Sequence, residues 1–243
     1  MAKPAASAPP LNRLIARLPA KEFERLKPLL KPVVLEFQQI LYEPRAPISY
    51  VYFPNRGVVS AINLMNDGDS IEVATIGNEG MVGLAAFFGA EPSPDRMLVQ
   101  VPGDALRMRA EDLRTETKDS EPFREIIGRY QGAFLKQIGQ AVACNGLHPV
   151  LKRCCRWILQ THDRVQSDEF PMTQEFLSHM LGVRRVSITE VLKPLEESGL
   201  IRKHRGTITV LNRKGLEAAS CECYRSVRDE FDRRLGKAGQ SFR

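Results

Sequence analysis

The chain has 243 residues, of which 43% are hydrophobic and 26% are charged, so its composition is that of an ordinary folded protein. No apolar run approaches the roughly 18 residues of a membrane span, and the start MAKPAASAPP lacks the apolar core of a signal peptide. All five cysteines lie at or after Cys144, which excludes the even cysteine framework of a small secreted domain. We therefore expect a cytoplasmic protein with reduced thiols, no membrane partner and, given its length, two domains.

The net charge of +6 is distributed unevenly along the chain. Residues 1–145 hold 17 basic and 17 acidic side chains, whereas residues 146–243 hold 18 basic and 12 acidic side chains. The entire positive excess therefore lies in the C-terminal part, where it can attract a polyanion such as nucleic acid. A solvated basic face is the alternative interpretation.

Residues 11–118 contain two kinds of local pattern. Apolar residues recur at helical spacing between Leu11 and Leu30, with an interruption at Pro19, which predicts two short helices. Six β-rich runs separated by proline and glycine then follow, and the tetrapeptide Asn66-Asp67-Gly68-Asp69 predicts a tight hairpin between two of them. The runs are VVLEF, SYVYF, GVVSAINLM, SIEVATI, MLVQV and ALRMR. Short strands at such close spacing predict a small antiparallel β-barrel or jelly roll.

A long helix is predicted from Glu121 to Cys144, after a short one that begins near Glu111. Apolar residues recur in it at intervals of three or four, as in the seam of a coiled coil. The seam consists of Phe123, Ile127, Tyr130, Phe134, Ile138 and Ala141. A narrow seam of this kind favours dimerisation against a second copy of the helix, and packing against the chain's own barrel is the alternative. A further helix is predicted from Pro149 to Arg164.

The stretch from Met172 to Leu211 predicts two short helices followed by a hairpin. Thr173 is a favourable N-cap, Gly182 ends the first helix, and Ser198-Gly199-Leu200 ends the second. Leu200–Lys203 and Thr207–Leu211 read as strands that flank a turn at Arg205-Gly206.

The second of these helices has two different faces. Ile188, Val191, Leu192 and Leu195 share the apolar face, whereas the opposite face carries donors and hydroxyls suited to base edges and phosphates. The candidate DNA-binding residues of the whole unit are Thr173, Arg184, Arg185, Ser187, Thr189, Glu190, Lys193, Arg202, Lys203 and Arg205. The pattern is that of a winged helix-turn-helix, in which the second helix enters the major groove and the wing lies on the DNA backbone. Paired helices of this kind also occur in domains that bind no nucleic acid, and the hairpin and the charge favour DNA.

This order of elements resembles the Crp/Fnr family of bacterial transcription regulators over nearly the whole chain, and the segment LGVRRVSITEVLKPLEESGLI resembles the family's recognition segment. The resemblance implies an α+β fold with a β-barrel sensor domain (11–118), a dimerisation helix (119–145) and a winged helix-turn-helix domain (146–235). It also implies a homodimer that binds double-stranded DNA, regulates transcription and contacts RNA polymerase.

The resemblance assigns roles to particular residues. In members of the family, an Arg-Glu pair and a later arginine face the bases; here Arg185 matches the first arginine, while Val186 and Glu190 replace the other two. In the sensor domain, family members that bind cyclic nucleotides carry a glutamate for the ribose and an arginine for the phosphate. The corresponding effector pocket here is Gly83, Leu84, Arg96 and Met97. Because Leu84 and Met97 replace polar partners, at about 1–3 kcal/mol for each unpaired group, the effector is expected to be something other than a standard cyclic nucleotide, or absent.

The spacing of the cysteines in the sequence matches no common motif for a cofactor or a metal ion. No cysteine lies near the N-terminus, where the Fnr-type cluster binds, and Cys144, Cys154, Cys155, Cys221 and Cys223 lack the C-x2-C spacing of common zinc sites. We expect them to serve as small buried hydrophobic residues, and a redox or metal switch that includes His148 is the alternative.

The sequence is also compatible with two other classes of function. One is a redox or metal-responsive protein that uses the cysteines, and the other is an interaction adaptor whose helix-turn-helix does not bind DNA. An enzyme is not expected, because the chain has only four histidines and shows no phosphate loop, Ser-His-Asp arrangement or paired-carboxylate motif.

Overall fold

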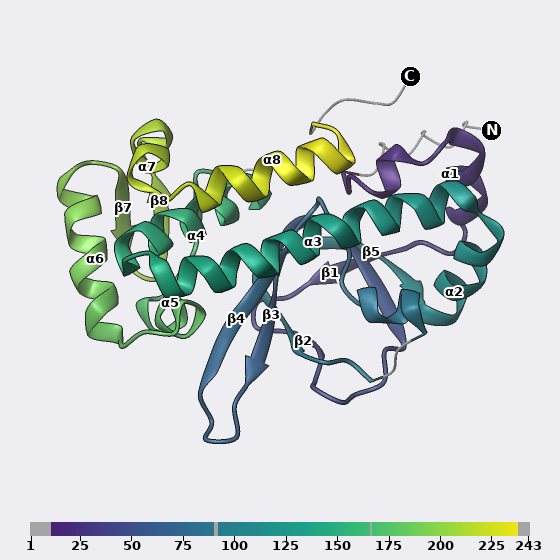
Figure 1. Cartoon of the computed structure of the whole chain (residues 1–243), viewed down its shortest axis with the longest axis horizontal. Helices are drawn as coiled ribbons and strands as arrows, with labels where there is room; N and C mark the ends of the chain where they lie inside the picture. Colours follow the sequence, from purple (N-terminus) through teal and green to yellow (C-terminus); the bar gives the residue numbers. More distant parts are fainter. Residues whose placement is uncertain (1–10, 90–91, 166, 238–243) are drawn as a thin grey trace, which may run out of the picture.

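One long helix, α3 (Glu121–Leu147), joins a β-rich half of the molecule to a helical half (Figure 1). The computed structural model describes residues 11–89, 92–165 and 167–237. The helix begins where the side chain of Ser120 accepts a hydrogen bond from the backbone N–H of Phe123, with Pro122 in the first turn. It ends at Leu147, beyond the predicted boundary at residue 145.

The β-rich half is built on an antiparallel sheet whose strands have the order β1-β5-β3-β4, with β2 alongside β5. The strands are β1 (Lys31–Leu35), β2 (Ile40–Tyr42), β3 (Tyr50–Leu64), β4 (Ser70–Ile76) and β5 (Arg96–Arg109). The predicted α+β class and jelly-roll character are confirmed. The sheet of the described residues is open, however, because its outer strands β1 and β4 do not pair with each other as they would in a closed barrel.

Strands β3 and β5 are longer than the sequence predicted, because each joins two of the predicted runs. The register of β3 against β5 shifts between Pro54 and Val58, so the chain bends there without leaving the sheet. Gly57 adopts a φ of 89°, and a Cβ at this position would lie 2.6 Å from the carbonyl oxygen of Val101. Proline and glycine therefore mark a bulge in a continuous strand here, and not the end of a strand.

Short helices complete this half of the molecule; the two within residues 11–30 and the one near Glu111 were predicted, whereas the one at residues 84–88 was not. They are η1 (Ile15–Arg17), α1 (Ala20–Leu26), η2 (Leu84–Phe88) and α2 (Ala110–Asp119), where η denotes a 3-10 helix. The predicted hairpin at Asn66–Asp69 joins β3 to β4 and is confirmed, with Gly68 at a φ of 94°. The sheet and the short helices enclose an apolar core that also contains one face of α3.

The helical half follows the predicted order, with one additional strand and one additional helix after the hairpin, neither of which was predicted. Its elements are α4 (Val150–Val165), β6 (Glu169–Pro171), α5 (Gln174–Leu181), α6 (Arg185–Glu197), β7 (Ile201–His204), β8 (Thr207–Val210) and α7 (Arg213–Ala219). The predicted hairpin β7–β8 is confirmed to within a residue at each end, and β6 adds a third strand in the order β6-β8-β7. A second apolar core lies around Trp157, Leu177 and Leu192 of this half, and strands β3 and β5 contribute Val58, Ile62 and Val101 to it.

The last helix, α8 (Cys223–Leu235), was not predicted, and it does not pack as part of the helical half alone. It runs back along α3 (Figure 1), where Val227, Phe231 and Leu235 join the apolar core of the β-rich half. The ring centroids of Tyr130 and Phe231 lie 6.3 Å apart. The predicted extent of the C-terminal domain, 146–235, therefore includes a helix that packs largely on the other half.

This arrangement corrects the predicted dimerisation seam. Phe123, Ile127 and Tyr130 are at most 1% exposed, and Ala141 is also buried, all within a single chain. Phe134 and Ile138 are partly buried against the same core. The seam therefore packs mainly against its own chain, which was the alternative interpretation, because α8 and the sheet supply the apolar partner that the sequence pattern indicated.

The two halves are joined by buried polar contacts as well. Arg164 of α4 pairs with Glu79, which follows β4, at 2.7 Å, and both side chains are at most 7% exposed. Nε1 of Trp157 donates a hydrogen bond to Glu72 of β4 at 2.9 Å. Among the described residues, none of the helices combines the length and the apolar content that crossing a bilayer requires.

Candidate nucleic-acid interface and sensor cavity

Helices α5 and α6 form a helix-turn-helix whose turn is defined by local signals. The side chain of Thr173 accepts a hydrogen bond from the backbone N–H of Phe176 and so caps α5. Gly182 takes the left-handed conformation, with a φ of 59°, directly after α5. α6 begins three residues later, at Arg185, so the predicted helix-turn-helix is confirmed.

The predicted two faces of α6 are present in the structure. Ile188, Leu192 and Leu195 are buried in the core of the helical half. The exposed residues at the start and on the opposite face are Arg184, Arg185, Val186, Thr189, Glu190 and Lys193. Because α6 lies at one end of the molecule, at the left of Figure 1, this polar face is not covered by another described element.

The wing, formed by β7 and β8, lies at the same end of the molecule as α6 (Figure 1). Arg202 and Arg205 are exposed, and the turn between the strands takes φ values of 41° at Arg205 and 82° at Gly206. Lys203 differs from the prediction, because its Nζ lies 2.9 Å from Glu196 Oε2 of α6 and its backbone N–H donates to the same carboxylate. Lys203 therefore holds the wing against α6, and a contact with phosphate would have to break this pair.

Three of the predicted DNA-binding residues carry hydroxyl groups, and two of them, Thr173 and Thr189, also make hydrogen bonds within the protein. Thr173 is used as the cap of α5, and Ser187 is only partly exposed. Oγ1 of Thr189 donates to Oε1 of Gln174 at 3.2 Å, which links the exposed faces of the two helices. Thr189 is the best placed of the three to reach a base edge, since it is exposed on α6.

Sequence reasoning omitted Val186 from the candidate residues, although the structure places it on the exposed face of α6. Its side chain is 67% exposed, next to Arg185. An apolar side chain on such a face can contact the methyl group of thymine. Its position in the first turn of the second helix was the available signal.

A cavity of about 200 Å³ lies between the sheet and α3, at the position of the predicted effector pocket. Gly83, Leu84 and Met97 line it, as predicted, together with side chains from η2 and α3. The α3 residues on its wall are Gln131, Phe134, Leu135 and Ile138. A side chain at Gly83 would place its Cβ 2.7 Å from the hydroxyl of Tyr42, so this glycine is required by the packing itself.

Arg96 does not line the cavity, which corrects its predicted role in the effector pocket. Its Nε and Nη2 donate to Glu43 at 2.9 and 3.1 Å on the outer side of the sheet. Successive side chains of a strand point to opposite faces, so Met97 faces the cavity and its neighbour Arg96 cannot do so. The phosphate partner implied by the resemblance is therefore not available at this position.

The electrostatics of the cavity also disfavour an anionic ligand. Asp95 is the charged residue among the described residues that line it, and burial raises the pKa of its carboxyl group. An ionised Asp95 would repel a phosphate, and a protonated one would offer a hydrogen bond to a neutral ligand. The other lining residues are mostly apolar, which suits a small neutral molecule.

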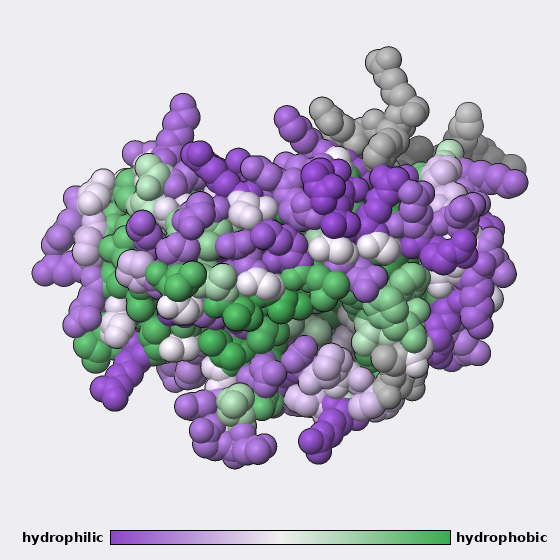
Figure 2. Space-filling view, viewed as in Figure 1, coloured by the Kyte–Doolittle hydropathy of each residue, from purple (hydrophilic) through white to green (hydrophobic). Residues whose placement is uncertain are grey.

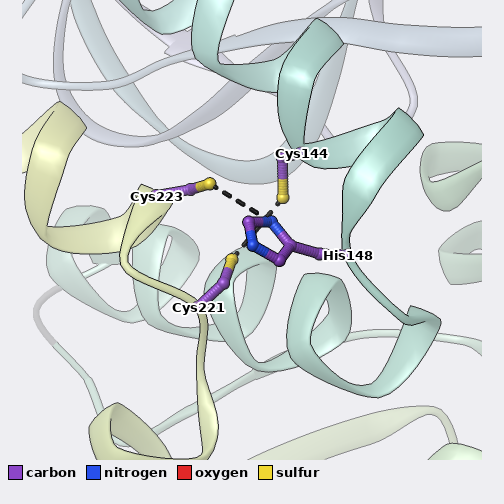
Figure 3. A group of neighbouring side chains, drawn as sticks. All are labelled: Cys144, His148, Cys221 and Cys223. Carbon is purple, nitrogen blue, oxygen red and sulfur yellow. Dashed lines mark hydrogen bonds between the residues drawn. The ribbon is translucent and has the colours of Figure 1, made fainter.

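The structure separates the five cysteines into two groups. Cys154 and Cys155 are fully buried in the core of the helical half, as predicted for small hydrophobic residues. Cys144, Cys221 and Cys223 instead gather around His148, where the end of α3 meets the start of α8 (Figure 3). The adjacent pair and the three clustered thiols therefore have different surroundings.

Comparison with known sequence families gives two matches that follow the two halves of the molecule. Residues 152–219 match the family described as the Crp-like helix-turn-helix domain. Residues 32–120 match the family described as the cyclic nucleotide-binding domain. No curated protein matches the chain.

Solved structures with the same fold include several transcription regulators. FixK2 from Bradyrhizobium japonicum is 14% identical, with a TM-score of 0.65 over 79% of this chain and 98% of its own. A CRP-family transcriptional regulator from Thermus thermophilus is 14% identical, with a TM-score of 0.64 over 86% of this chain and 100% of its own. CLP from Xanthomonas campestris, described as a c-di-GMP-responsive global regulator, is 18% identical, with a TM-score of 0.61 over 79% of this chain and 99% of its own.

Proposed function

The chain belongs to the Crp/Fnr family of transcription regulators, and we propose that it binds a specific two-fold DNA site as a homodimer and is not an enzyme. The observation that supports the proposal most directly is the exposed face of α6, which carries Arg184, Arg185 and Thr189 and lies at the same end of the molecule as the wing. Such a regulator acts on chromosomal DNA, so we place it in the cytoplasm, with RNA polymerase as a further partner.

We assign base reading to the first turns of α6. Arg185 is exposed and suited to a bidentate contact with guanine, and Val186 beside it is suited to the methyl group of a thymine. Arg202 and Arg205 on the wing would contact phosphates, which position the domain without reading sequence. The target sequence should therefore differ from that of relatives with an acidic residue in place of Val186.

A homodimer is best supported by the face of α3 that the chain leaves uncovered. Leu135 and Val142 are 59% and 70% exposed, and Leu147 is exposed near the end of the helix. Figure 2 shows hydrophobic side chains gathered along α3 on this side of the molecule. A heptad spacing connects the residues of this face, which are Gly128, Gln131, Leu135, Ile138, Val142 and Asn145. We propose this set, which we call the outer seam, as the dimer contact in place of the predicted seam, with which it shares only the partly buried Ile138.

We propose that the effector, where one acts, is a small neutral molecule of largely apolar character that binds in the cavity beneath η2. The mostly apolar lining and the single acidic side chain support this class over cyclic AMP or a dinucleotide of the kind named for CLP. Leu135 and Ile138 belong both to the cavity wall and to the outer seam. A ligand in the cavity would thus touch the helix through which the two copies would meet.

Selection of bound genomic fragments by the purified full-length protein tests the proposal. We expect enrichment of a two-fold symmetric sequence whose half-sites lie about 10–10.5 base pairs apart, because two copies of α6 enter successive major grooves. A recovered fragment should be bound more tightly than a scrambled one, with an affinity that falls steeply as salt is raised. Absence of enrichment together with absence of a mobility shift at low salt would favour an adaptor or a redox protein instead.

A further inference from the structure

Four metal-ligating side chains converge where α3 ends and α8 begins. Cys144 lies in the last turn of α3, and His148, four residues later, is the residue that follows the helix, with its backbone N–H donating to the carbonyl oxygen of Cys144. Cys221 lies in the connection between α7 and α8, and Cys223 is the first residue of α8; Figure 3 shows all four side chains pointing toward a common centre. The two pairs are more than seventy residues apart in sequence, so only the fold brings them together.

The spacing of the four ligand atoms corresponds to that of a tetrahedral metal site. The Sγ atoms of Cys144 and Cys221 are 3.5 Å apart, as are Sγ of Cys223 and Nδ1 of His148, and all four atoms lie within 4.8 Å of one another. Around a tetrahedral zinc ion, bonds of about 2.3 Å to sulfur and about 2.0–2.1 Å to nitrogen imply ligand separations of about 3.6–3.8 Å. The described side chains therefore need to move only slightly to meet this geometry.

The outer contacts of the cluster are those that metal ligands usually have. The other ring nitrogen of His148, Nε2, lies 3.3 Å from Oε1 of Glu222. A carboxylate at this position fixes the tautomer in which Nδ1 is free to bind a metal. Nε2 of Gln140 donates a hydrogen bond to Sγ of Cys223 at 3.1 Å, which stabilises a thiolate.

The charge around the cluster also suits three thiolates. With a neutral histidine and a divalent ion, three thiolates leave one net negative charge at the site. Arg153 and Arg156 of α4 are each 8% exposed, and both act electrostatically on Cys144. The Nε atom of each has no hydrogen-bond partner among the described residues, so these buried cations are only partly compensated.

We propose that Cys144, His148, Cys221 and Cys223 form a structural site for one Zn²⁺ ion. The set Cys3His is a common ligand combination of structural zinc sites, in which all four positions are occupied by protein. The ion would hold the end of α3 against the start of α8, and so would fix the helical half, which lies between these helices in sequence, relative to the sensor half.

Two other interpretations fit the geometry less well. The three cysteines form a small cluster of their own, separate from both apolar cores, and they surround an imidazole, so they do not act simply as hydrophobic filling. An iron–sulfur cluster needs its protein ligands farther apart, because the ligands bind several iron atoms around an inorganic core. Ligand atoms that all lie within 4.8 Å of one another enclose a single ion.

Metal analysis of the native full-length protein, purified without a metal-binding tag, tests the proposal. We expect about one zinc ion per chain, lost in Cys221→Ser and in His148→Ala. Cys154→Ser is the matched control, because it also replaces a fully buried cysteine but lies outside the cluster, and it should retain the metal. Zinc retained by Cys221→Ser, or an absence of bound metal in the native protein, would overturn the proposal.

A second test uses the absorption spectrum of Co²⁺ bound in place of zinc. It needs only the native protein, so it does not depend on the folding of any variant. Native protein stripped with a chelator and given Co²⁺ should show the intense visible bands of tetrahedral cobalt and a thiolate charge-transfer band. Weak octahedral bands or no uptake would overturn the site. Iron and sulfide in the native protein would overturn the assignment to zinc, and so would a disulfide between Cys144 and Cys221 in freshly prepared protein.

The role of Glu222 offers a graded test of the same site. Glu222→Gln should weaken zinc binding by about 10–100-fold in competition with a chelator, as loss of a carboxylate partner does for other metal-bound histidines. Asp229→Asn removes an exposed carboxylate from the same helix and should leave the affinity unchanged. Equal affinities for both variants would contradict the arrangement in which His148 binds the metal through Nδ1.

Discussion

The two faces of α3 have similar apolar patterns but different surroundings. One face, with Phe123, Ile127 and Tyr130, is enclosed by the sheet and by α8 of its own chain. The other face, with Leu135 and Val142, is largely exposed. Apolar periodicity therefore indicates that a helix face is buried, but not which partner buries it. Substitutions on the enclosed face should therefore change mainly the free energy of unfolding, and substitutions on the exposed face should change mainly the dissociation constant of the dimer.

The largest effect is expected on the enclosed face. Phe123→Ala should lower the free energy of unfolding by about 3–5 kcal/mol, because it leaves a cavity beside Phe53 in the core. The oligomeric state of the protein that stays folded should not change. Denaturant unfolding combined with sedimentation measures both quantities, and a monomer that is otherwise stable would place Phe123 in the dimer contact after all.

The reverse outcome is expected on the exposed face. Val142→Asp should change the stability of the folded chain by no more than about 0.5 kcal/mol. It should raise the dissociation constant of the dimer by about 100-fold or more, since each copy brings an unpaired charge into the outer seam. Lys136→Asp introduces the same residue one position from the seam and serves as the control. Sedimentation in which the Val142 variant stays dimeric while the Lys136 variant dissociates would reject the outer seam.

A smaller effect, dependent on pH, is expected where the two halves meet. Burial raises the pKa of Glu72 to about 7 from its ordinary 4.5, so the folded protein holds this proton more tightly than the unfolded chain does. The contribution of Glu72 to stability should therefore fall as the pH rises from about 4.5 to about 7, and then level off. Glu72→Gln should flatten this part of the profile.

Trp157 offers a direct readout of this titration, since it is the single tryptophan of the chain and donates to Glu72. Its fluorescence should follow the protonation of Glu72 in the native protein and lose that transition in Glu72→Gln. Glu43→Gln, on the outer side of the sheet, should keep the transition. An unchanged transition in Glu72→Gln would assign the titration to another group.

The smallest effect is expected at the wing. Arg205→Ala should weaken binding to specific and scrambled DNA alike, and should reduce the salt slope of the binding constant by about one per contact, or about two for a dimer. Lys203→Ala should act differently, because Lys203 pairs with Glu196 and supports the position of the wing. Equal salt slopes for native protein and Arg205→Ala would remove Arg205 from the phosphate contacts.

The sequence predicted most accurately the helix caps and turns, which are determined by residues close together in the chain. Thr173, Gly182 and the turn at Arg205-Gly206 act within a few residues of themselves, so the helix-turn-helix and its wing could be placed closely. The cluster around His148 and the partner of α3 depend on contacts between segments far apart in the chain. Two local signals were still available, namely the helical spacing of Val227, Phe231 and Leu235, and the spacing of four between Cys144 and His148.

The incorrect assignment of Arg96 to the effector pocket shows a second limit of prediction from sequence, which concerns the direction in which a strand residue points. The resemblance placed this arginine at the phosphate of a cyclic nucleotide, but its strand neighbour Met97 occupies the inward position. Strand alternation from Met97 could have excluded Arg96 from the pocket, provided that the inward face of this strand was known. Only the packing against η2 and α3 determined that face.

The proposal that α6 reads DNA sequence is tested most directly by the Arg185→Ala variant. Its affinity is measured for a selected site and for a scrambled duplex, at two salt concentrations. We expect a loss of about 1–3 kcal/mol on the selected site, relaxed preference at one base pair of each half-site, and little loss on the scrambled duplex. Equal losses on both duplexes would contradict the proposal, because Arg185 would then contact only the backbone of the DNA.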